Sequence, residues 1–191
     1  VEAVMARELL LLSGLSSDDQ TCADIEAGRS LVIPVLTGSP LDAMPQQPRR
    51  AAGALQRTAL LVPFADRADA FLVHVGGEGQ DQLVLLPRTA AGLTVEHLPN
   101  IAAHPLFAVC FDGVDPAQGT VVAAGPAAAS NVALAQERAA VLRAAELYGA
   151  GCSLLDKTVR YAKERRQFGQ AIGQFQAVQY LCTDIAVNVH L

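Results

Sequence analysis

The sequence predicts an α+β protein of several domains, in which an antiparallel β-barrel or sandwich is followed by an all-α helical bundle. Two observations predict this fold class. Apolar residues recur at helical steps near the start of the chain, alternate in short runs from Ser30 to Val122, and return to helical steps after Gly125-Pro126. Turn-forming residues separate the short runs, as in antiparallel sheets. We therefore expect three parts, at residues 1–28, 29–124 and 125–191.

The first part has the pattern of two short helices. Val1 to Ser13 is apolar with charged residues interspersed, and the pattern ends near Gly14. Ser16 to Asp19 offers N-cap side chains for a second helix, which would end near Gly28. This part is expected to be the end of an N-terminal helical domain.

The middle part contains seven short runs that are rich in strand-forming residues. Their lengths and turn spacing favour an antiparallel barrel or sandwich. Thr37 to Pro40 and Met44 to Gly53 contain prolines and paired arginines and are expected to be exposed loops. The expected strands are Leu31–Leu36, Arg57–Val62, Ala70–Val75, Gln82–Leu86, Leu93–His97, Phe107–Phe111 and Thr120–Val122.

The last part predicts a helix from Ala129 to Glu164, roughly 50 Å long, and an antiparallel helix returning from Gln174 to His190. Two helices cannot bury a long apolar stripe by themselves. The chain is therefore expected either to be cut at both ends or to receive the missing helices from another chain, and not to exist as a monomer. The stripe consists of Leu134, Val141, Ala145, Tyr148, Cys152, Leu155, Val159 and Ala162.

Composition narrows the class of protein. With 51% hydrophobic and 17% charged residues, the 191-residue chain has ample material for a buried core. A net charge of −5 argues against a nucleic-acid partner. No apolar run is long enough to cross a bilayer, and no signal peptide is recognisable. Widely spaced cysteines that read as reduced thiols favour a cytoplasmic protein. The four cysteines and four histidines lack metal-ligand spacing, which predicts reduced core thiols and no metal site.

A basic turn separates the two C-terminal helices. The local charge reverses the acidic balance of the chain and predicts an anion site. Gly169 and Gly173 supply the positive φ and the close backbone approach that a turn against a phosphate needs. The alternative is that cations in the last helical turn complement the helix dipole. The basic residues are Lys157, Arg160, Lys163, Arg165 and Arg166.

The run from Tyr161 to Ala186 resembles the signature of the acyl-CoA dehydrogenase family at the start of its C-terminal helical domain. The matching residues are Tyr161, Arg165, Gln167-Phe168-Gly169, Ile172, Phe175-Gln176 and Asp184. Two further segments, Ala59 to Val75 and Phe111 to Pro116, also resemble the family. The resemblance implies the tail of the N-terminal domain, the whole middle barrel and half of the C-terminal bundle.

The resemblance also implies a cofactor and its ligands. In the family, an arginine and a glutamine eleven residues later reach across a dimer interface to an FAD that the neighbouring subunit mainly holds. These residues match Arg165 and Gln176, and the resemblance implies that Phe168 packs beside them. An acyl-CoA substrate and a homo- or hetero-oligomer, a dimer or tetramer, are implied as partners.

Two segments that contact the flavin in the family differ here. Thr37-Gly38-Ser39-Pro40 keeps the threonine of the first segment and lacks its acidic residues, so Thr37 is a candidate hydrogen-bond donor to the flavin. The second segment, usually Trp-Ile-Thr or Trp-Ile-Ser, corresponds to Leu61-Val62-Pro63. Leucine does not stack as tryptophan does, and proline offers no hydroxyl and no N–H. The alternative is that these are ordinary barrel residues.

The reaction of the family removes the α-proton of an acyl-CoA thioester with a glutamate, while the β-hydrogen leaves as hydride to the flavin. Glu137 on the long helix is a candidate for this base, because it continues the apolar stripe below Val141. An ungapped count from Phe168 places the helical base position of the family at Ala139. The alternatives are a dipole-complementing surface role for Glu137 and a base in a loop beyond Leu191.

Three functional hypotheses follow. The first is an FAD-dependent acyl-CoA dehydrogenase, an oxidoreductase of lipid metabolism and fatty acid β-oxidation. The second is a non-catalytic structural subunit of a hetero-oligomeric dehydrogenase, which completes the FAD site of its partner. The third is a flavin monooxygenase or oxidase on the same fold. Leu61, Pro63 and Ala139 favour the second hypothesis, and the basic turn does not distinguish it from the first.

Overall fold

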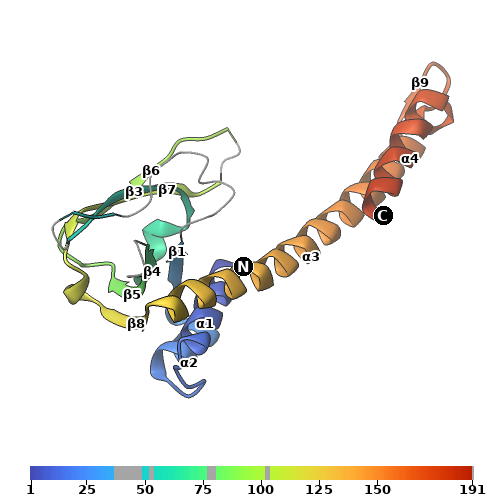
Figure 1. The fold of residues 1–191 in the computed structure, drawn as a ribbon. Helices are drawn as coiled ribbons and strands as arrows, with labels where there is room; N and C mark the ends of the chain where they lie inside the picture. Colours follow the sequence, from blue (N-terminus) through green and yellow to red (C-terminus); the bar gives the residue numbers. More distant parts are fainter. Residues whose placement is uncertain (37–48, 52–53, 77–80, 102–103, 191) are drawn as a thin grey trace. The chain divides into compact units, whose positions relative to one another are not determined.

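The computed structural model describes residues 1–36, 49–51, 54–76, 81–101 and 104–190. The chain divides into two compact units, Val1–Ala139 and Ala140–Leu191. The first unit contains the sheets and two short helices, and the second contains a helical hairpin (Figure 1). The long helix α3, Pro126–Glu164, begins in the first unit and continues in the second.

Two helices open the first unit. Helix α1 spans Glu2–Leu12 and helix α2 spans Gln20–Glu26. The Asp19 carboxylate accepts a hydrogen bond of 2.9 Å from the Thr21 N–H, so the predicted capping cluster does begin α2.

The strands of the first unit form two four-stranded sheets, with orders β1-β4-β5-β8 and β2-β3-β7-β6. The predicted β-rich part followed by helices is therefore confirmed, and within the described part of the chain the sheets make a sandwich and no closed barrel. The strands are β1 (Val32–Val35), β2 (Arg49–Ala51), β3 (Ala54–Pro63), β4 (Ala70–Val75), β5 (Gln82–Pro87), β6 (Leu93–His97), β7 (Leu106–Val114) and β8 (Thr120–Ala124). Two 3-10 turns, η1 (Ala65–Arg67) and η2 (Pro116–Gln118), lie between them.

Two features of the sheets differ from the expectation. Strand β2 lies within the stretch expected to be an exposed loop, because its residues pair antiparallel with the start of β3. Strand β1 pairs with β4 in parallel, whereas an antiparallel sheet was predicted. Pairing between distant segments decides both features, and hydrophobic periodicity carries no information about the direction of a partner strand.

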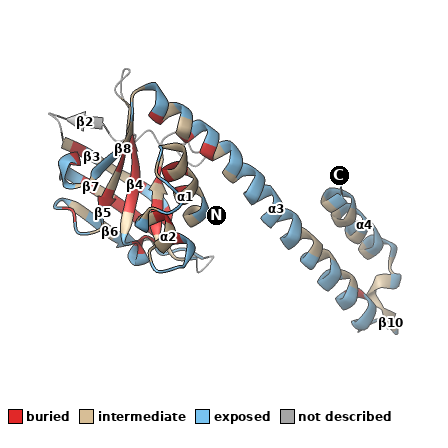
Figure 2. Cartoon of the chain, turned by 90° about the horizontal axis from the view of Figure 1, so that it is seen from below, coloured by how far each residue is buried: buried red, intermediate tan, exposed pale blue. Residues whose placement is uncertain are grey.

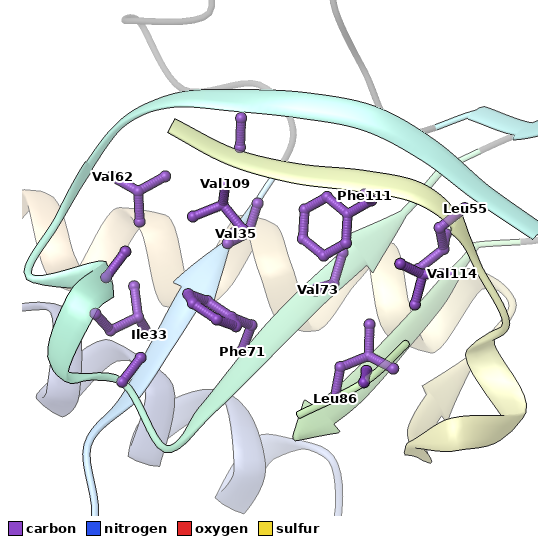
Figure 3. Close-up of a cluster of buried hydrophobic side chains, with 14 of the residues drawn as sticks. Ile33, Val35, Leu55, Val62, Phe71, Val73, Leu86, Val109, Phe111 and Val114 are labelled. Atoms are coloured by element: carbon purple, nitrogen blue, oxygen red, sulfur yellow. The ribbon is translucent and has the colours of Figure 1, made fainter. Parts of the chain in front are cut away.

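A core cluster lies between the two sheets (Figure 3). Side chains alternate along each strand, so Phe71 and Val73 of β4 face this core while Leu72 between them faces the other way. Across the core lie Val109 and Phe111 of β7. This burial of both inner faces is what joins the two sheets.

A second cluster lies on the outer face of the β1-β4-β5-β8 sheet. Leu72 and Leu83 pack there against buried residues of α1, α2 and the first turns of α3. Among them are Leu9, Leu10, Ile25, Ala128, Val132 and Ala135. The Asn131 side chain also donates a 3.0 Å hydrogen bond to the Leu12 carbonyl, so the start of α3 is fixed to α1.

In the second unit, α3 is followed by a short β-hairpin, a 3-10 turn and helix α4. These are β9 (Arg166–Gln167), β10 (Gln170–Ala171), η3 (Ile172–Gln174) and α4 (Gln176–His190). Helix α4 packs on the last turns of α3, where Gly151 leaves room for Val189: a β-carbon on Gly151 would lie 3.0 Å from that side chain. Most residues of this unit are exposed (Figure 2). Val141 and Tyr148 of the predicted stripe are among them.

Candidate functional site

A β-hairpin forms where α3 ends, at the basic turn that the sequence singled out. The Arg165 N–H donates to the Tyr161 carbonyl at 2.8 Å and closes the helix. Strands β9 and β10 then pair antiparallel, with Gln167 opposite Gln170 and Arg166 opposite Ala171. The Ile172 N–H donates to the Arg165 carbonyl at 2.8 Å, which adds one more bond to the ladder.

The two residues at the hairpin tip are both left-handed. Phe168 has φ 52° and Gly169 has φ 82°. Positive φ at both central residues is the pattern of a type I′ turn, whose twist suits a two-residue hairpin loop. Gly169 therefore has the predicted conformational role, whereas the left-handed conformation of Phe168 was not anticipated.

The hairpin displays its candidate cofactor ligands to the outside. The Arg165 side chain is exposed, and within the described residues its guanidinium makes no hydrogen bond and no ion pair. The Phe168 side chain is 92% exposed. Its ring contacts Phe175 edge-on, with centroids 6.2 Å apart. An exposed guanidinium and an exposed aromatic ring three residues apart in the chain can together receive a planar ligand that carries an anion.

Gln176 is the first residue of α4, so it lies on the same short segment as Arg165 and Phe168. Its Nε2 donates to the Tyr180 hydroxyl one helical turn later. Tyr180 was not among the predicted site residues, although its i,i+4 spacing from Gln176 could have identified it. Gln179 fixes the start of α4 to η3, because its Nε2 donates a 3.0 Å hydrogen bond to the Gly173 carbonyl.

The other basic residues of the predicted anion site lie around the end of α3. Lys157, Arg160, Lys163 and Arg166 are all exposed, and in the described structure none of them forms an ion pair. Between Lys157 and Arg166 there are five basic residues and one acidic residue, Glu164. The unit offers a cationic surface at the hairpin and the last turns of α3.

The segment Leu61-Val62-Pro63 ends strand β3 in the first unit. Leu61 has φ 59° and Phe64 has φ 56°, so two residues without the freedom of glycine are left-handed on either side of the buried Val62. The Leu61 side chain is exposed, and Pro63 lacks an N–H. Side-chain hydrogen bonding to a flavin ring is therefore not available from these residues. Thr37, the other predicted contact, lies outside the described residues.

Glu137, the candidate base, lies on α3 within the first unit and is exposed. Two residues earlier, Ala135 is buried against the cluster that contains Leu9 and Leu10, so Glu137 points away from that cluster. The next residue, Arg138, forms an ion pair with Glu8 of α1. The role of Glu137 stays a prediction.

Two kinds of feature are absent from the described residues. No group of three or more His, Cys, Asp or Glu side chains is placed to hold a metal ion there. No helix in that part of the chain is long and apolar enough to cross a membrane.

Comparison with known proteins gives one family match. Residues 124–191 match the model of the acyl-CoA dehydrogenase C-terminal domain. The chain is 32% identical over 184 residues to acyl-CoA dehydrogenase FadE34 of Mycobacterium tuberculosis (strain ATCC 25618 / H37Rv), covering 88% of the chain and 26% of that protein. It is 49% identical over 53 residues to acyl-CoA dehydrogenase IpdE2 of Mycolicibacterium smegmatis, covering 28% of the chain and 17% of that protein. The chain thus spans only 26% and 17% of the length of these two relatives.

Solved structures share the fold. The ChsE4-ChsE5 complex from Mycobacterium tuberculosis matches with a TM-score of 0.79 at 23% identity, over 98% of this chain and 51% of that chain. Butyryl-CoA dehydrogenase from Megasphaera elsdenii matches with a TM-score of 0.78 at 18% identity, over 98% of this chain and 53% of that chain. The chain spans about half of each solved structure.

Proposed function

We propose, since the chain belongs to the acyl-CoA dehydrogenase family, that it is part of an FAD-dependent acyl-CoA dehydrogenase. In this proposal the reaction removes the α-proton of an acyl-CoA thioester and the β-hydrogen as hydride. The chemistry that FAD would supply is the acceptance of that hydride. The assembly would be a dimer or tetramer of like or unlike chains, acting in lipid metabolism.

The β9–β10 hairpin carries this proposal. FAD contains a diphosphate and two aromatic ring systems, and the hairpin presents a guanidinium that pairs with none of the described residues and an exposed phenyl ring within four residues. A guanidinium fork is well suited to a diphosphate. Arg165, Phe168 and Gln176 would hold the diphosphate and adenine end of an FAD whose ring is held by a neighbouring subunit.

The first unit fits the flavin ring less well. Leu61 and Pro63 offer no side-chain hydrogen bond and no aromatic surface at the segment that resembles the flavin contact of the family. Thr37 remains a proposed hydrogen-bond donor. An enzyme with one FAD per chain would need its contacts to the ring from this threonine, from main-chain groups or from residues outside this sequence.

This poor fit favours a second candidate function, a non-catalytic subunit of a mixed dehydrogenase. Such a subunit would lend Arg165 and Gln176 to the FAD of an unlike partner and bind no flavin ring itself. That a complex of ChsE4 with ChsE5 has this fold supports a mixed assembly. In this case the catalytic base would lie on the partner, and Glu137 would be a surface residue.

Flavin stoichiometry separates the two functions. The full-length protein would be purified with any co-purifying partner, and its flavin absorbance compared with the amount of each chain. One FAD per chain supports a catalytic chain with its own flavin site. One FAD for each pair of unlike chains supports the structural subunit. The absence of flavin from every assembled form would reject both.

If FAD is present on each chain, Glu137→Gln tests the proposed base. Because glutamine keeps the shape of the side chain and cannot accept the α-proton, turnover of acyl-CoA should be lost while FAD stays bound. Unchanged turnover would remove Glu137 from the proposal and leave the cofactor assignment intact.

A further inference from the structure

The hairpin has two faces that the linear sequence does not separate. Side chains that stand directly opposite each other in an antiparallel ladder share a face, and successive pairs alternate. Gln167 stands opposite Gln170, and Arg166 stands opposite Ala171. Arg165 bonds through its carbonyl to Ile172, two positions from Gln167, so its side chain shares the face of the glutamine pair.

The Arg165 face therefore carries one guanidinium and two carboxamides, from Arg165, Gln167 and Gln170, together with the Ile172 side chain opposite Arg165. The opposite face carries Arg166 and Ala171. Arg165 and Gln167 are exposed and Gln170 is half-buried. Among the described contacts the Gln170 amide has no hydrogen-bond partner of its own, so both of its N–H donors are available to a ligand on this face.

The structure assigns Gln170, opposite Gln167 on the Arg165 face, as a further ligand of the FAD diphosphate, and it places Arg166 outside the site. This assignment rests on the proposed function of the hairpin. A cross-strand pair of carboxamides has β-carbons about 4.5–5.5 Å apart, so two amides can donate to neighbouring phosphate oxygens beside the guanidinium. Arg166 has the same charge as its neighbour, but its side chain leaves from the other face.

The test uses the full-length protein in its assembled form, stripped of flavin and titrated with FAD while flavin fluorescence is followed. Gln170→Leu keeps the size of the side chain and removes its donors. We expect it to weaken FAD binding about 10- to 150-fold, the range for one hydrogen bond to a charged group. Gln170→Glu should weaken binding further, because it sets a carboxylate beside the diphosphate.

Arg166→Ala is the matched control, since it removes a neighbouring cation from the opposite face. It should bind FAD within about twofold of the wild type. The salt dependence of FAD affinity gives a second readout. Arg165→Ala should reduce the salt dependence because it removes a charge from the site. Gln170→Leu should lower FAD affinity and leave its salt dependence unchanged. Melting of the FAD-free assemblies shows whether a variant has lost its structure instead.

The outcomes separate this inference from the proposed function. If Arg165→Ala weakens FAD binding while both Gln170 variants bind like the wild type, the assignment of Gln170 is overturned and the function of the hairpin stands. The assignment also fails if Arg166→Ala costs as much affinity as Arg165→Ala. If none of the variants, including Arg165→Ala, changes FAD affinity, the proposed function itself is overturned.

Discussion

Gly173 lies so close to the end of α3 that a β-carbon on it would stand 3.0 Å from the carbonyl oxygen of Ala162. That oxygen belongs to helix backbone and cannot swing aside as a flexible side chain can. The close approach lets the chain turn back within a few residues of α3. Arg165, Phe168 and Gln176 are consequently displayed on one short segment.

Gly173→Ala is therefore expected to destabilise the hairpin by about 1–3 kcal/mol, the usual cost of forcing a methyl group into a packed site. FAD affinity should fall with it, because the turn positions the ligands. Thermal unfolding and FAD titration of the assembled protein measure the two effects.

Gly149→Ala on α3 is the control, since nothing lies within 4 Å of its added methyl. The free energy of unfolding of this variant should instead rise by about 0.5–1 kcal/mol, because alanine has a higher helix propensity than glycine. Equal stability of the two variants would contradict the close contact.

Phe168 is strained and exposed, which allows its conformation and its contacts to be tested separately. Phe168→Asn places the favoured Asn-Gly pair in the type I′ turn and should relieve about 1 kcal/mol of left-handed strain. The FAD-free protein is expected to melt at the same or a higher temperature, yet to bind FAD more weakly because the ring is lost. Gly169→Ala should lower the melting temperature, since its φ is 82°. Undiminished FAD binding by Phe168→Asn would exclude the ring from the site.

His74 links stability to pH. Burial lowers the pKa of its imidazole below the ordinary value of 6.5, and the Asp81 carboxylate, 3.3 Å from Nε2, opposes that shift. A base with a lowered pKa stays neutral in the folded state while the unfolded chain takes up a proton. The stability contributed by neutral His74 is thus complete above pH 6.5 and is lost as pH falls toward the lowered folded pKa.

Melting curves between about pH 5 and pH 8 measure this linkage. His74→Leu should flatten the pH dependence of the melting temperature. Asp81→Asn should steepen the loss in acid, because it removes the carboxylate that favours the imidazolium. A variant at His74 with the full wild-type pH dependence would show that another group is responsible.

An exposed apolar stripe on α3 predicts an interface. Leu147, Leu154 and Tyr161 are spaced seven residues apart, so they lie along one side of the helix, and they are 66%, 61% and 59% exposed. Leu154→Glu is expected to weaken assembly by at least tenfold, because a charge would be buried without a partner. Ser153→Glu adds the same charge on another face and serves as the control. Light scattering that finds the full-length wild type to be a monomer with FAD bound would refute the interface.

Much of this fold could be predicted because periodicity is local. The change from helix to strand and back is visible in the residues themselves, and β1 and β8 begin within two residues of their expected positions. The parallel pairing of β1 with β4 could not be predicted, since it depends on which distant segment offers a free edge. Strand β2 was missed for the same reason, because Arg49 and Arg50 form a strand only through their pairing with β3.

The candidate site, like the fold, could be predicted only in part from the sequence. Spacing and glycines indicated the turn, and resemblance indicated Arg165 and Gln176. What spacing could not give was the face on which each side chain lies, so Arg165 and Arg166 looked equivalent before their cross-strand partners were known. The Tyr180 contact to Gln176, in contrast, was within reach of the sequence, because the helix predicted from Gln174 to His190 contains both residues at i,i+4 spacing.

The most direct test of the central claim is the FAD affinity of the assembled full-length protein after substitution of Arg165. Arg165→Ala should weaken binding by about 1.5–3 kcal/mol, the range for a charge-assisted hydrogen bond. Arg165→Lys should fall between alanine and the wild type, because it keeps the charge and loses the fork. The FAD-free protein should melt as the wild type does. FAD affinity that is unchanged in Arg165→Ala would contradict the claim that this hairpin completes an FAD site.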